Sequence, residues 1–301
     1  MPLLKVKSKE MVESLVEVGV RRGGLLFLHS SLSAIGEVEG GAEAVVDALL
    51  DALGPEGTLV VPTFTYADQH DYPESIDPKW IFDRATTRSG MGAITNAVRM
   101  REGAMRSVHL WHSVAAIGPL AETVVTGNGK AWASAWDENS PMAWVFNNGG
   151  SILMLGVPYQ NLTAVHVWEV EFGVDYRDTQ FITRRTPLSD GTLVPLASQV
   201  HARNGKHTGS DFNRMGERME KAGLVSIGHV ANAVARLFTA ADAHEMARTM
   251  YAEDKAAFLK QGDSITPLSY GHTITNAKGT QCVVDPAQAF PTPPATEPHE
   301  D

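Results

Sequence analysis

A histidine and a glutamate stand three residues apart in residues 161–169, among small and apolar side chains. On a helix, side chains three positions apart lie on the same face. Glu169 could therefore orient the imidazole of His166 and raise its basicity, and proton abstraction at neutral pH needs such a base. A His-x-x-Glu pair alone is more often packed or solvated than catalytic, so its meaning depends on the rest of the chain.

Two further polar segments accompany this pair. Residues 28–36 read Leu-His-Ser-Ser-Leu-Ser-Ala-Ile-Gly, and residues 106–118 read Arg-Ser-Val-His-Leu-Trp-His-Ser-Val-Ala-Ala-Ile-Gly. In this order and at this spacing, the three segments resemble the aminoglycoside 3-N-acetyltransferase family, from about Gly23 to about Asp254. The resemblance implies that family's own α/β fold, a mixed sheet with flanking helices, and not the GCN5-type acetyltransferase fold.

The resemblance also implies the reaction, which is acetylation of the 3-amino group of an aminoglycoside by acetyl-CoA. His166 would take a proton from the substrate amine, and Glu169 would hold the imidazole and stabilise its charged form. The amine would then attack the thioester directly. Cys282 is the single cysteine and lies near the C-terminal tail, so we expect no acyl-cysteine intermediate.

Two segments would contact coenzyme A in this family. Backbone N–H groups and hydroxyls in a turn between a strand and a helix suit phosphate or pantetheine amides, although a plain polar loop would look the same. The second segment would form the floor of the coenzyme channel, and its alternative is a turn capped by serines around a packed histidine. The predicted coenzyme residues are Ser30, Ser31, Leu32, Gly36, Arg106, Ser107, His109, Ser113 and Val114.

The predicted acceptor contacts lie near the thioester position and in an acidic loop. Thr65 could donate a hydrogen bond to a developing oxyanion, although threonine is also simply common in strands. Carboxylates between residues 66 and 77 would attract a cationic sugar. Asp211 opens a late helix and could equally be its cap. The predicted acceptor residues are Thr65, Tyr66, Asp68, Trp168, Glu171 and Asp211.

Two positions depart from the family pattern. Leu110 replaces a proline that commonly follows the histidine, and Asn96 stands where relatives commonly carry a glutamate. The first change should loosen a turn, and the second removes one acidic substrate contact. These departures leave open an acyltransferase of the same fold that acts on a different amine.

A metal-dependent hydrolase is the other alternative. Five histidines invite it, but the chain has no His-Glu-x-x-His motif, and we expect no metal. Metal analysis of the purified protein separates this alternative from both transferases. The five are His29, His70, His109, His112 and His166.

Composition narrows the partners. The net charge of −10 argues against a nucleic-acid partner and fits a polycationic amine, although solubility explains most of these charges. The chain has no apolar run of membrane-spanning length, and its N-terminus lacks the features of a signal peptide. We therefore expect a cytoplasmic protein without a membrane partner, and the sequence leaves open a homodimer.

Apolar periodicity and turn residues predict the elements that position these motifs. The order of helix, strand, turn, helix and strand indicates α/β layers, in which ligand groups gather at the carboxyl ends of strands. We expect one domain over residues 1–285 and a disordered tail over 286–301. The predicted helices cover 9–20, 41–53, 89–101, 212–223, 228–239 and 241–261, with another starting at Ser140; the predicted strands cover 25–28, 58–62, 113–117 and 152–156, with antiparallel strands in 184–207.

Overall fold

A sheet of seven strands forms the centre of the structure, a computed structural model that describes residues 7–65, 77–129, 133–262, 265, 266, 268, 272–275 and 281–284. β1 runs parallel to its neighbours β2 and β5, and the outer strands run antiparallel. The predicted mixed sheet is confirmed. Its strand order is β3 (Met105–Arg106), β4 (Val114–Ile117), β2 (Thr58–Pro62), β1 (Leu25–Ser30), β5 (Ser151–Leu155), β9 (Ala233–Thr239) and β8 (Ser226–Val230).

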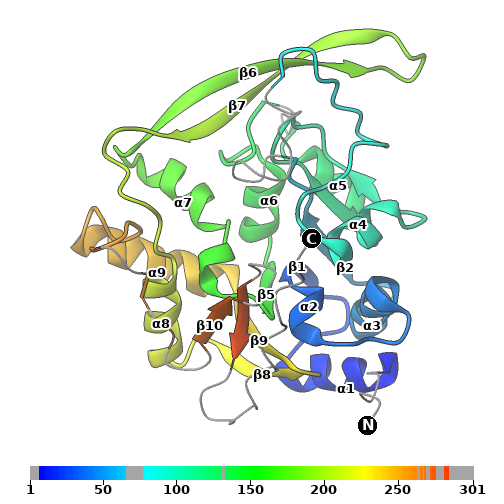
Figure 1. Cartoon of the computed structure of the whole chain (residues 1–301), viewed down its shortest axis with the longest axis vertical. Coiled ribbons are helices and arrows are strands. Elements are labelled where there is room, and N and C mark those ends of the chain that lie inside the picture. The colour runs from blue at the N-terminus through cyan, green and yellow to red at the C-terminus, as the bar shows by residue number, and fades with distance from the viewer. Residues whose placement is uncertain are drawn as a thin grey trace, which may run out of the picture.

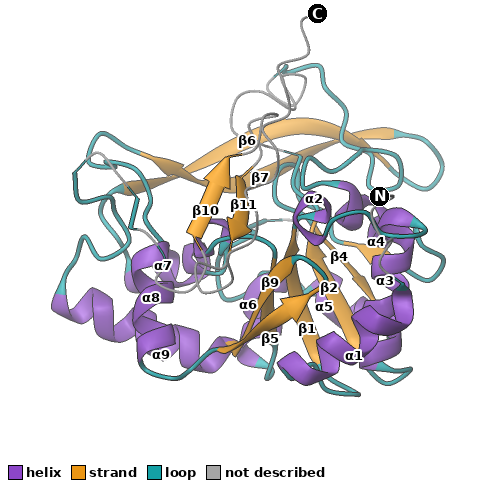
Figure 2. Ribbon diagram, turned by 60° about the horizontal axis from the view of Figure 1, so that its bottom comes forward, coloured by secondary structure: helices purple, strands orange, loops and turns teal. Residues whose placement is uncertain are grey.

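Helices cover both faces of this sheet. Successive strand residues point to opposite faces, so Leu26 and Leu28 of β1 pack in one apolar layer and Phe27 packs in the other. Figure 2 shows the two groups of helices on either side of the strands. One layer holds α1 (Ser8–Val18), α3 (Gly41–Leu53) and α4 (Ala93–Met100), and the other holds α5 (Ala121–Thr126), α6 (Pro141–Asn147), α7 (Val165–Phe172), α8 (Asn213–Lys221) and α9 (Ala240–Glu253).

The predicted helix over residues 228–239 is wrong, because this segment belongs to the antiparallel pair β8 and β9. Ala231 turns the chain between the two strands with a φ of 53°. Ala233 to Phe238 are all buried and, apart from Arg236, all apolar; a strand buried on both faces reads as such a nearly continuous apolar run. Such a short run cannot be told from a buried helix by periodicity alone.

Two predicted helix boundaries also differ from the structure. The helix predicted from Ser89 begins at Ala93, because the Ser89 hydroxyl donates to the carbonyl of Phe64 and accepts from the amide of Met91. These bonds shape the turn before α4. The last predicted helix, 241–261, ends at Glu253 in α9.

A long ribbon of two strands stands apart from the sheet. β6 (Arg177–Pro187) and β7 (Leu193–Arg203) pair along eleven residues each, beginning before the predicted start at residue 184. In Figure 1 the ribbon arches over α7 and α6. The amide of Phe82 donates to the carbonyl of Arg185, and Leu196 packs with Phe82 and Leu110. These contacts fix the ribbon to loops around the sheet.

The remaining described elements are short. They are α2 (Leu32–Ile35), the 3-10 helix η2 (Tyr159–Asn161), and the antiparallel pair β10 (His272–Thr275) and β11 (Gln281–Val284). Within the described residues, every helix is too short or too polar to cross a bilayer.

Candidate active site

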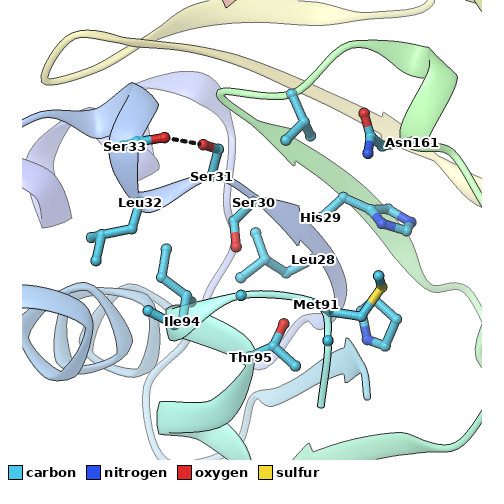
Figure 3. A pocket seen from close by; sticks show the side chains of 15 residues that line it. Leu28, His29, Ser30, Ser31, Leu32, Ser33, Met91, Ile94, Thr95 and Asn161 are labelled. Carbon is cyan, nitrogen blue, oxygen red and sulfur yellow. Dashed lines mark hydrogen bonds between the residues drawn. The ribbon is translucent and has the colours of Figure 1, made fainter. Parts of the chain in front are cut away.

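A cavity of about 600 Å³ opens at the carboxyl ends of β1 and β2. Figure 3 shows His29 and Ser30 of β1 facing Met91 and Thr95, with Asn161 at one end. Such strand ends are where ligands bind in α/β folds. The cavity is lined by Leu28, His29, Ser30, Ser31, Leu32, Ser33, Pro62, Gly90, Met91, Gly92, Ala93, Ile94, Thr95, Val157 and Asn161.

The turn after β1 forms one wall of this cavity. The Ser31 hydroxyl accepts from the amide of Ala34 at 3.4 Å, and this bond caps α2. The Ser31 and Ser33 hydroxyls lie 3.0 Å apart. The structure therefore brings Ser30, Ser31 and Leu32 together on the cavity wall, and their contact with coenzyme stays a prediction.

Gly36, the fourth predicted coenzyme residue of this turn, ends α2 with a φ of 101°. A Cβ atom there would meet the side-chain nitrogen of Asn232 at 2.6 Å. Both observations explain the glycine by backbone conformation and packing. Its contact with coenzyme stays a prediction.

The start of α4 forms the opposite wall. The sequence predicted this helix but not its place beside the cavity. Asn96 stabilises it from behind, because its amide nitrogen donates to the carbonyls of Ser89 at 2.8 Å and Gly92 at 2.9 Å. Its amide oxygen accepts from the Ser89 amide at 3.1 Å. Asn96 thus holds the turn that borders the cavity.

His166 and Glu169 lie on one face of α7, as predicted. The distance between His166 Nδ1 and Glu169 Oε2 is 2.6 Å. An ionised carboxylate can only accept, so Nδ1 donates and Nε2 keeps its lone pair. The His166 side chain is 19% exposed, whereas that of Glu169 is 0% exposed. The pair therefore presents one basic nitrogen near the surface and hides its carboxylate.

Glu169 has further partners that come from the ribbon. Arg177 Nε forms an ion pair with Glu169 Oε2 at 2.8 Å, and the Tyr176 hydroxyl donates to Oε1 at 3.0 Å. Burial opposes ionisation of Glu169, but His166, through its charge when it is protonated and through its hydrogen bond, and then the charge of Arg177 outweigh burial and lower the pKa of Glu169 to about 2. Glu169 is therefore ionised at neutral pH.

His166 lies between two aromatic rings. Trp136 and Phe212 both meet it edge to face, with centroids 5.0 Å and 5.3 Å away. Burial and the charge of Arg177 lower the pKa of His166, while Glu169 raises it in part. His166 is thus held neutral at the pH where a general base must accept a proton.

A short stretch of chain connects the cavity to His166. Asn161 lines the cavity at the end of η2, and α7 starts four residues later. Thr163 Oγ1 lies 3.5 Å from His29 Nε2. Burial lowers the pKa of His29 to about 3, so this histidine is neutral. Asn161 and Thr163 thus connect the cavity lining to the start of α7.

Arg106 is buried among protein atoms. Its Nε donates to Thr63 Oγ1 at 3.1 Å and to Ser113 Oγ at 3.0 Å, and its Nη2 donates to the carbonyl of Thr63 at 2.8 Å. The guanidinium also lies over the ring of Phe82, 5.2 Å from its centroid. These contacts make Arg106 and Ser113 a brace at the end of β2.

His109 joins the loop between β3 and β4 to the ribbon. Its Nδ1 accepts from the amides of Trp111 at 3.2 Å and His112 at 2.9 Å, and its Nε2 contacts the carbonyl of Gln199 at 3.1 Å. Burial lowers the pKa of His109 to about 4. The neutral tautomer with a proton on Nε2 satisfies all three contacts.

The Ser107 amide donates to the carbonyl of Val114 at 2.9 Å, and the Ser107 hydroxyl accepts from the Val114 amide at 2.9 Å. As far as the chain is described, Arg106, Ser107, His109, Ser113 and Val114 lie outside the cavity lining. Their predicted place at the channel floor stays a prediction.

The predicted acceptor residues lie in different places. Thr65 is buried, and the loop between β3 and β4 engages it, since its hydroxyl donates to the carbonyl of Leu110 at 2.5 Å and its amide to that of Trp111 at 2.9 Å. Trp168 is packed in the core. Tyr66 and Asp68 lie outside the described residues.

The other two acidic acceptor residues have protein partners. Glu171 Oε1 lies 2.9 Å from His244 Nε2. Asp211 is buried, and its Oδ2 accepts from the amide of Thr266 at 3.0 Å and from its hydroxyl at 2.6 Å. Contact of either residue with an acceptor stays a prediction.

Sequence reasoning missed the partners of the His166–Glu169 pair. Tyr176 and Arg177 lie where β6 begins, just past the glycine that ends α7. Trp136 comes from the segment before α6, far along the chain. The one local signal for Arg177 is that a basic residue follows the His-x-x-Glu helix after a short turn. No known spacing rule connects such a residue to the glutamate.

Known proteins resemble this chain in sequence and in fold. A family model described as aminoglycoside 3-N-acetyltransferase matches residues 27–252. Aminoglycoside N(3)-acetyltransferase III of Salmonella sp is 34% identical over 211 residues, which is 65% of this chain and 72% of the relative.

Solved structures agree. The apoenzyme of aminoglycoside acetyltransferase AAC(3)-IVa has a TM-score of 0.72 at 28% identity and covers 87% of this chain and 94% of its own. The structure of AAC-VIa bound to sisomicin has a TM-score of 0.69 at 28% identity and covers 83% of this chain and 99% of its own. The comparisons of sequence and of fold therefore both find aminoglycoside acetyltransferases.

Proposed function

Because the chain belongs to the aminoglycoside 3-N-acetyltransferase family, we propose that it moves the acetyl group of acetyl-CoA to an amine of an aminoglycoside, with His166 as general base. The observation that carries the proposal is the 2.6 Å bond between His166 Nδ1 and the buried carboxylate of Glu169. It fixes the tautomer and leaves Nε2 free to accept a proton.

The proposed reaction is a direct transfer. The neutral amine of the acceptor attacks the thioester carbonyl carbon, a C–N bond forms, and the C–S bond breaks. His166 Nε2 takes the proton that the amine nitrogen loses, and the coenzyme A thiolate leaves and takes up a proton. Glu169 stabilises the imidazolium while it exists, because its ionised carboxylate accepts from Nδ1.

The cavity suits the coenzyme. Ser30, Ser31 and Ser33 bring hydroxyl groups to one wall, and pantetheine carries amides that such groups bind. Gly90 and Gly92 in the opposite wall have no side chains that would fill the space. Acetyl-CoA is the co-substrate that we assign to this cavity.

The acceptor is proposed from charge and from a relative. AAC-VIa binds sisomicin in its solved structure, and this chain carries a net charge of −10, which favours cationic ligands. Asn96 forms hydrogen bonds with its own turn, so any acidic contact from that position is absent here. We expect a narrower or shifted choice of aminoglycosides.

A thiol-release assay tests the function. The purified protein is mixed with acetyl-CoA and with single acceptors from a panel of aminoglycosides and simple monoamines. We expect release of coenzyme A with at least one aminoglycoside, together with a mass gain of one acetyl group in that acceptor. Equal rates with neutral monoamines would contradict an aminoglycoside acceptor, and the absence of thiol release with all acceptors would contradict the transferase.

The coenzyme cavity has its own test, Ala93→Trp. Ala93 lines the cavity at the start of α4, so an indole there should occupy coenzyme space. Acetyl-CoA should raise the melting temperature of the wild type and not that of the variant, because a ligand stabilises the state that binds it. Met100→Trp is the matched control, since Met100 ends the same helix and is 65% exposed. Equal stabilisation of both variants would place coenzyme elsewhere.

A further inference from the structure

We propose that Arg177 is a positioning residue whose fixed positive charge keeps His166 neutral, and so available as a base, at neutral pH. This inference rests on the proposed function, because it gives His166 the role of base. Arg177 is the first residue of β6 and comes from outside the helix that carries the His166–Glu169 pair.

The geometry places an imidazole nitrogen and a guanidinium nitrogen on one carboxylate oxygen. Glu169 Oε2 lies 2.6 Å from His166 Nδ1 and 2.8 Å from Arg177 Nε. A buried carboxylate with only a histidine beside it favours the imidazolium, because the charged pair is stronger than the neutral one. A guanidinium at the same oxygen already compensates the carboxylate, so the gain from protonating His166 is smaller.

Arg177 is held in this place by contacts of its two terminal nitrogens. The side chain is 6% exposed. Its Nη1 donates to the carbonyl of His201 at 3.1 Å, and its Nη2 lies 3.4 Å from His207 Nε2. Arginine stays protonated in proteins, so the charge at Glu169 is permanent.

The chain turns sharply to bring Arg177 back to α7. Gly173 ends the helix with a φ of 64°, and the amide of Val174 donates to the carbonyl of Glu169 at 3.2 Å. Tyr176 then bonds Glu169 through its hydroxyl, and its carbonyl accepts from Asn204 beyond the end of β7. The base of the ribbon is thereby tied to the helix that carries the histidine.

Other ionisable groups surround the pair, and most are neutral. Burial lowers the pKa of His201 and that of His207 to about 4, and it lowers the pKa of His112 well below its ordinary value. Arg203 is charged but exposed at the end of β7, where water screens it. The groups that face the pair from α7, β6, β7 and the neighbouring loops are His112, Tyr176, Arg177, His201, Arg203 and His207.

The test measures protonation of His166 in the free protein. Histidine-labelled wild type and Arg177→Met are titrated by NMR without substrate, and His166→Asn identifies the signal. We expect the His166 midpoint to rise by about one pH unit in Arg177→Met, because a like charge a few ångströms away disfavours the imidazolium by an amount of this size. Arg177→Lys should keep most of the wild-type midpoint, because it keeps the charge.

Lys206→Met is the matched control. Lys206 lies just beyond the ribbon, and its ammonium pairs with Asp175 at the exposed surface. The Lys206→Met substitution removes one positive charge, as Arg177→Met does, but Lys206 does not contact Glu169. The His166 midpoint should therefore stay unchanged. Arg177→Gln replaces Arg177→Met if the methionine variant does not fold.

Kinetics give a second readout. The acid limb of kcat/KM for Arg177→Met should move to higher pH with the NMR midpoint, and much of the loss at pH 7 should be recovered at about pH 8.5. An unchanged or lower His166 midpoint in the folded variant would overturn the inference, as would a loss of kcat/KM that is equal at all pH values. The titration needs no turnover, so failure of the proposed function appears separately, in the thiol-release assay.

Discussion

The two sides of the candidate site are built in different ways. On the sheet side, Ser30 and Thr95 border an open cavity between a strand end and a helix start, and the lining has no ionised side chain among the described residues. On the ribbon side, Arg177 meets a fully buried carboxylate in a closed network. The sheet side supplies space for a ligand, and the ribbon side sets the charge of the base. Changes on one side should therefore alter binding, and changes on the other should alter protonation.

His166→Ala should have the largest effect, because His166 is the proposed general base. Loss of a general base lowers turnover by at least about a hundredfold. Stabilisation by acetyl-CoA in thermal melting should persist, since the cavity lining does not include His166 in the described structure. The measurement pairs initial rates with melting curves. Near-wild-type turnover would remove His166 from the mechanism.

Glu169→Gln should come next, and it tests the closed network by stability. It leaves Arg177 buried without its counter-charge, and breaking a buried pair in this way costs about 3 kcal/mol of unfolding free energy. Turnover should fall less than in His166→Ala. Glu171→Gln is the control, because Glu171 lies on the same helix in a pair that is half exposed, and it should cost less than about 1 kcal/mol.

A double-mutant cycle sharpens this result. If Arg177 and Glu169 act as one unit, Glu169→Gln with Arg177→Met should destabilise less than the sum of the two single changes. Denaturant titration of the four proteins gives the coupling. Strict additivity would mean that the 2.8 Å ion pair has no energetic role, and the contrast between the two sides would lose its basis.

Acid pH should lower the free energy of unfolding, since buried neutral histidines lie in β1 and in the loop that contacts the ribbon. Burial lowers the pKa of His29 to about 3 and that of His109 to about 4, from an ordinary value of 6.5. Below pH 6.5 these two histidines bind protons in the unfolded chain but stay neutral in the folded chain until the pH approaches their lowered pKa values. Stability is therefore complete above that pH and falls toward pH 4, by about 1.4 kcal/mol per pH unit for each such histidine.

His109→Asn measures the share of a single histidine. Unfolding free energies at several pH values between 4 and 7 should show a smaller slope in the variant, by about one proton. The asparagine carbonyl can replace Nδ1 as acceptor but does not reach Gln199, so stability at pH 7 should fall modestly. A slope equal to that of the wild type would mean that His109 takes up a proton as readily in the folded protein as in the unfolded chain.

Local patterns explain which parts of this contrast the sequence predicted. β1 and β5 are buried on both faces and read as apolar runs, and His166 with Glu169 obeys the helical spacing, so these were found. The turn at Ser30 and Ser31 was found because polar residues directly follow a buried strand. All of these signals lie within a few consecutive residues.

Long-range pairing explains what the sequence did not predict. Arg177 reaches Glu169 because the chain reverses after α7. The Thr65 hydroxyl donates to the carbonyl of Leu110, which lies forty-five positions further along the chain. The residue type shows that a side chain can donate a hydrogen bond, but it does not show which group accepts that bond. The wrong helix prediction over 228–239 has a related cause. β9 pairs with β5 and β8, and a short segment of sequence does not show which distant strand it will pair with.

The smallest predicted effect concerns how the ribbon is attached to the sheet side. The buried Ser198 hydroxyl accepts from the amide of Leu110 at 3.2 Å, so Ser198→Ala leaves that amide without this acceptor and should cost about 1 kcal/mol in denaturant unfolding. Thr183→Ala, at an exposed position on β6, should change stability by less than about 0.5 kcal/mol. The His166 midpoint should stay the same in both variants, because the base of the ribbon is held separately by Tyr176 and Arg177. A shifted midpoint in Ser198→Ala would show that the charge network depends on the whole ribbon, and the two sides of the site would then have to be treated as one mechanical unit.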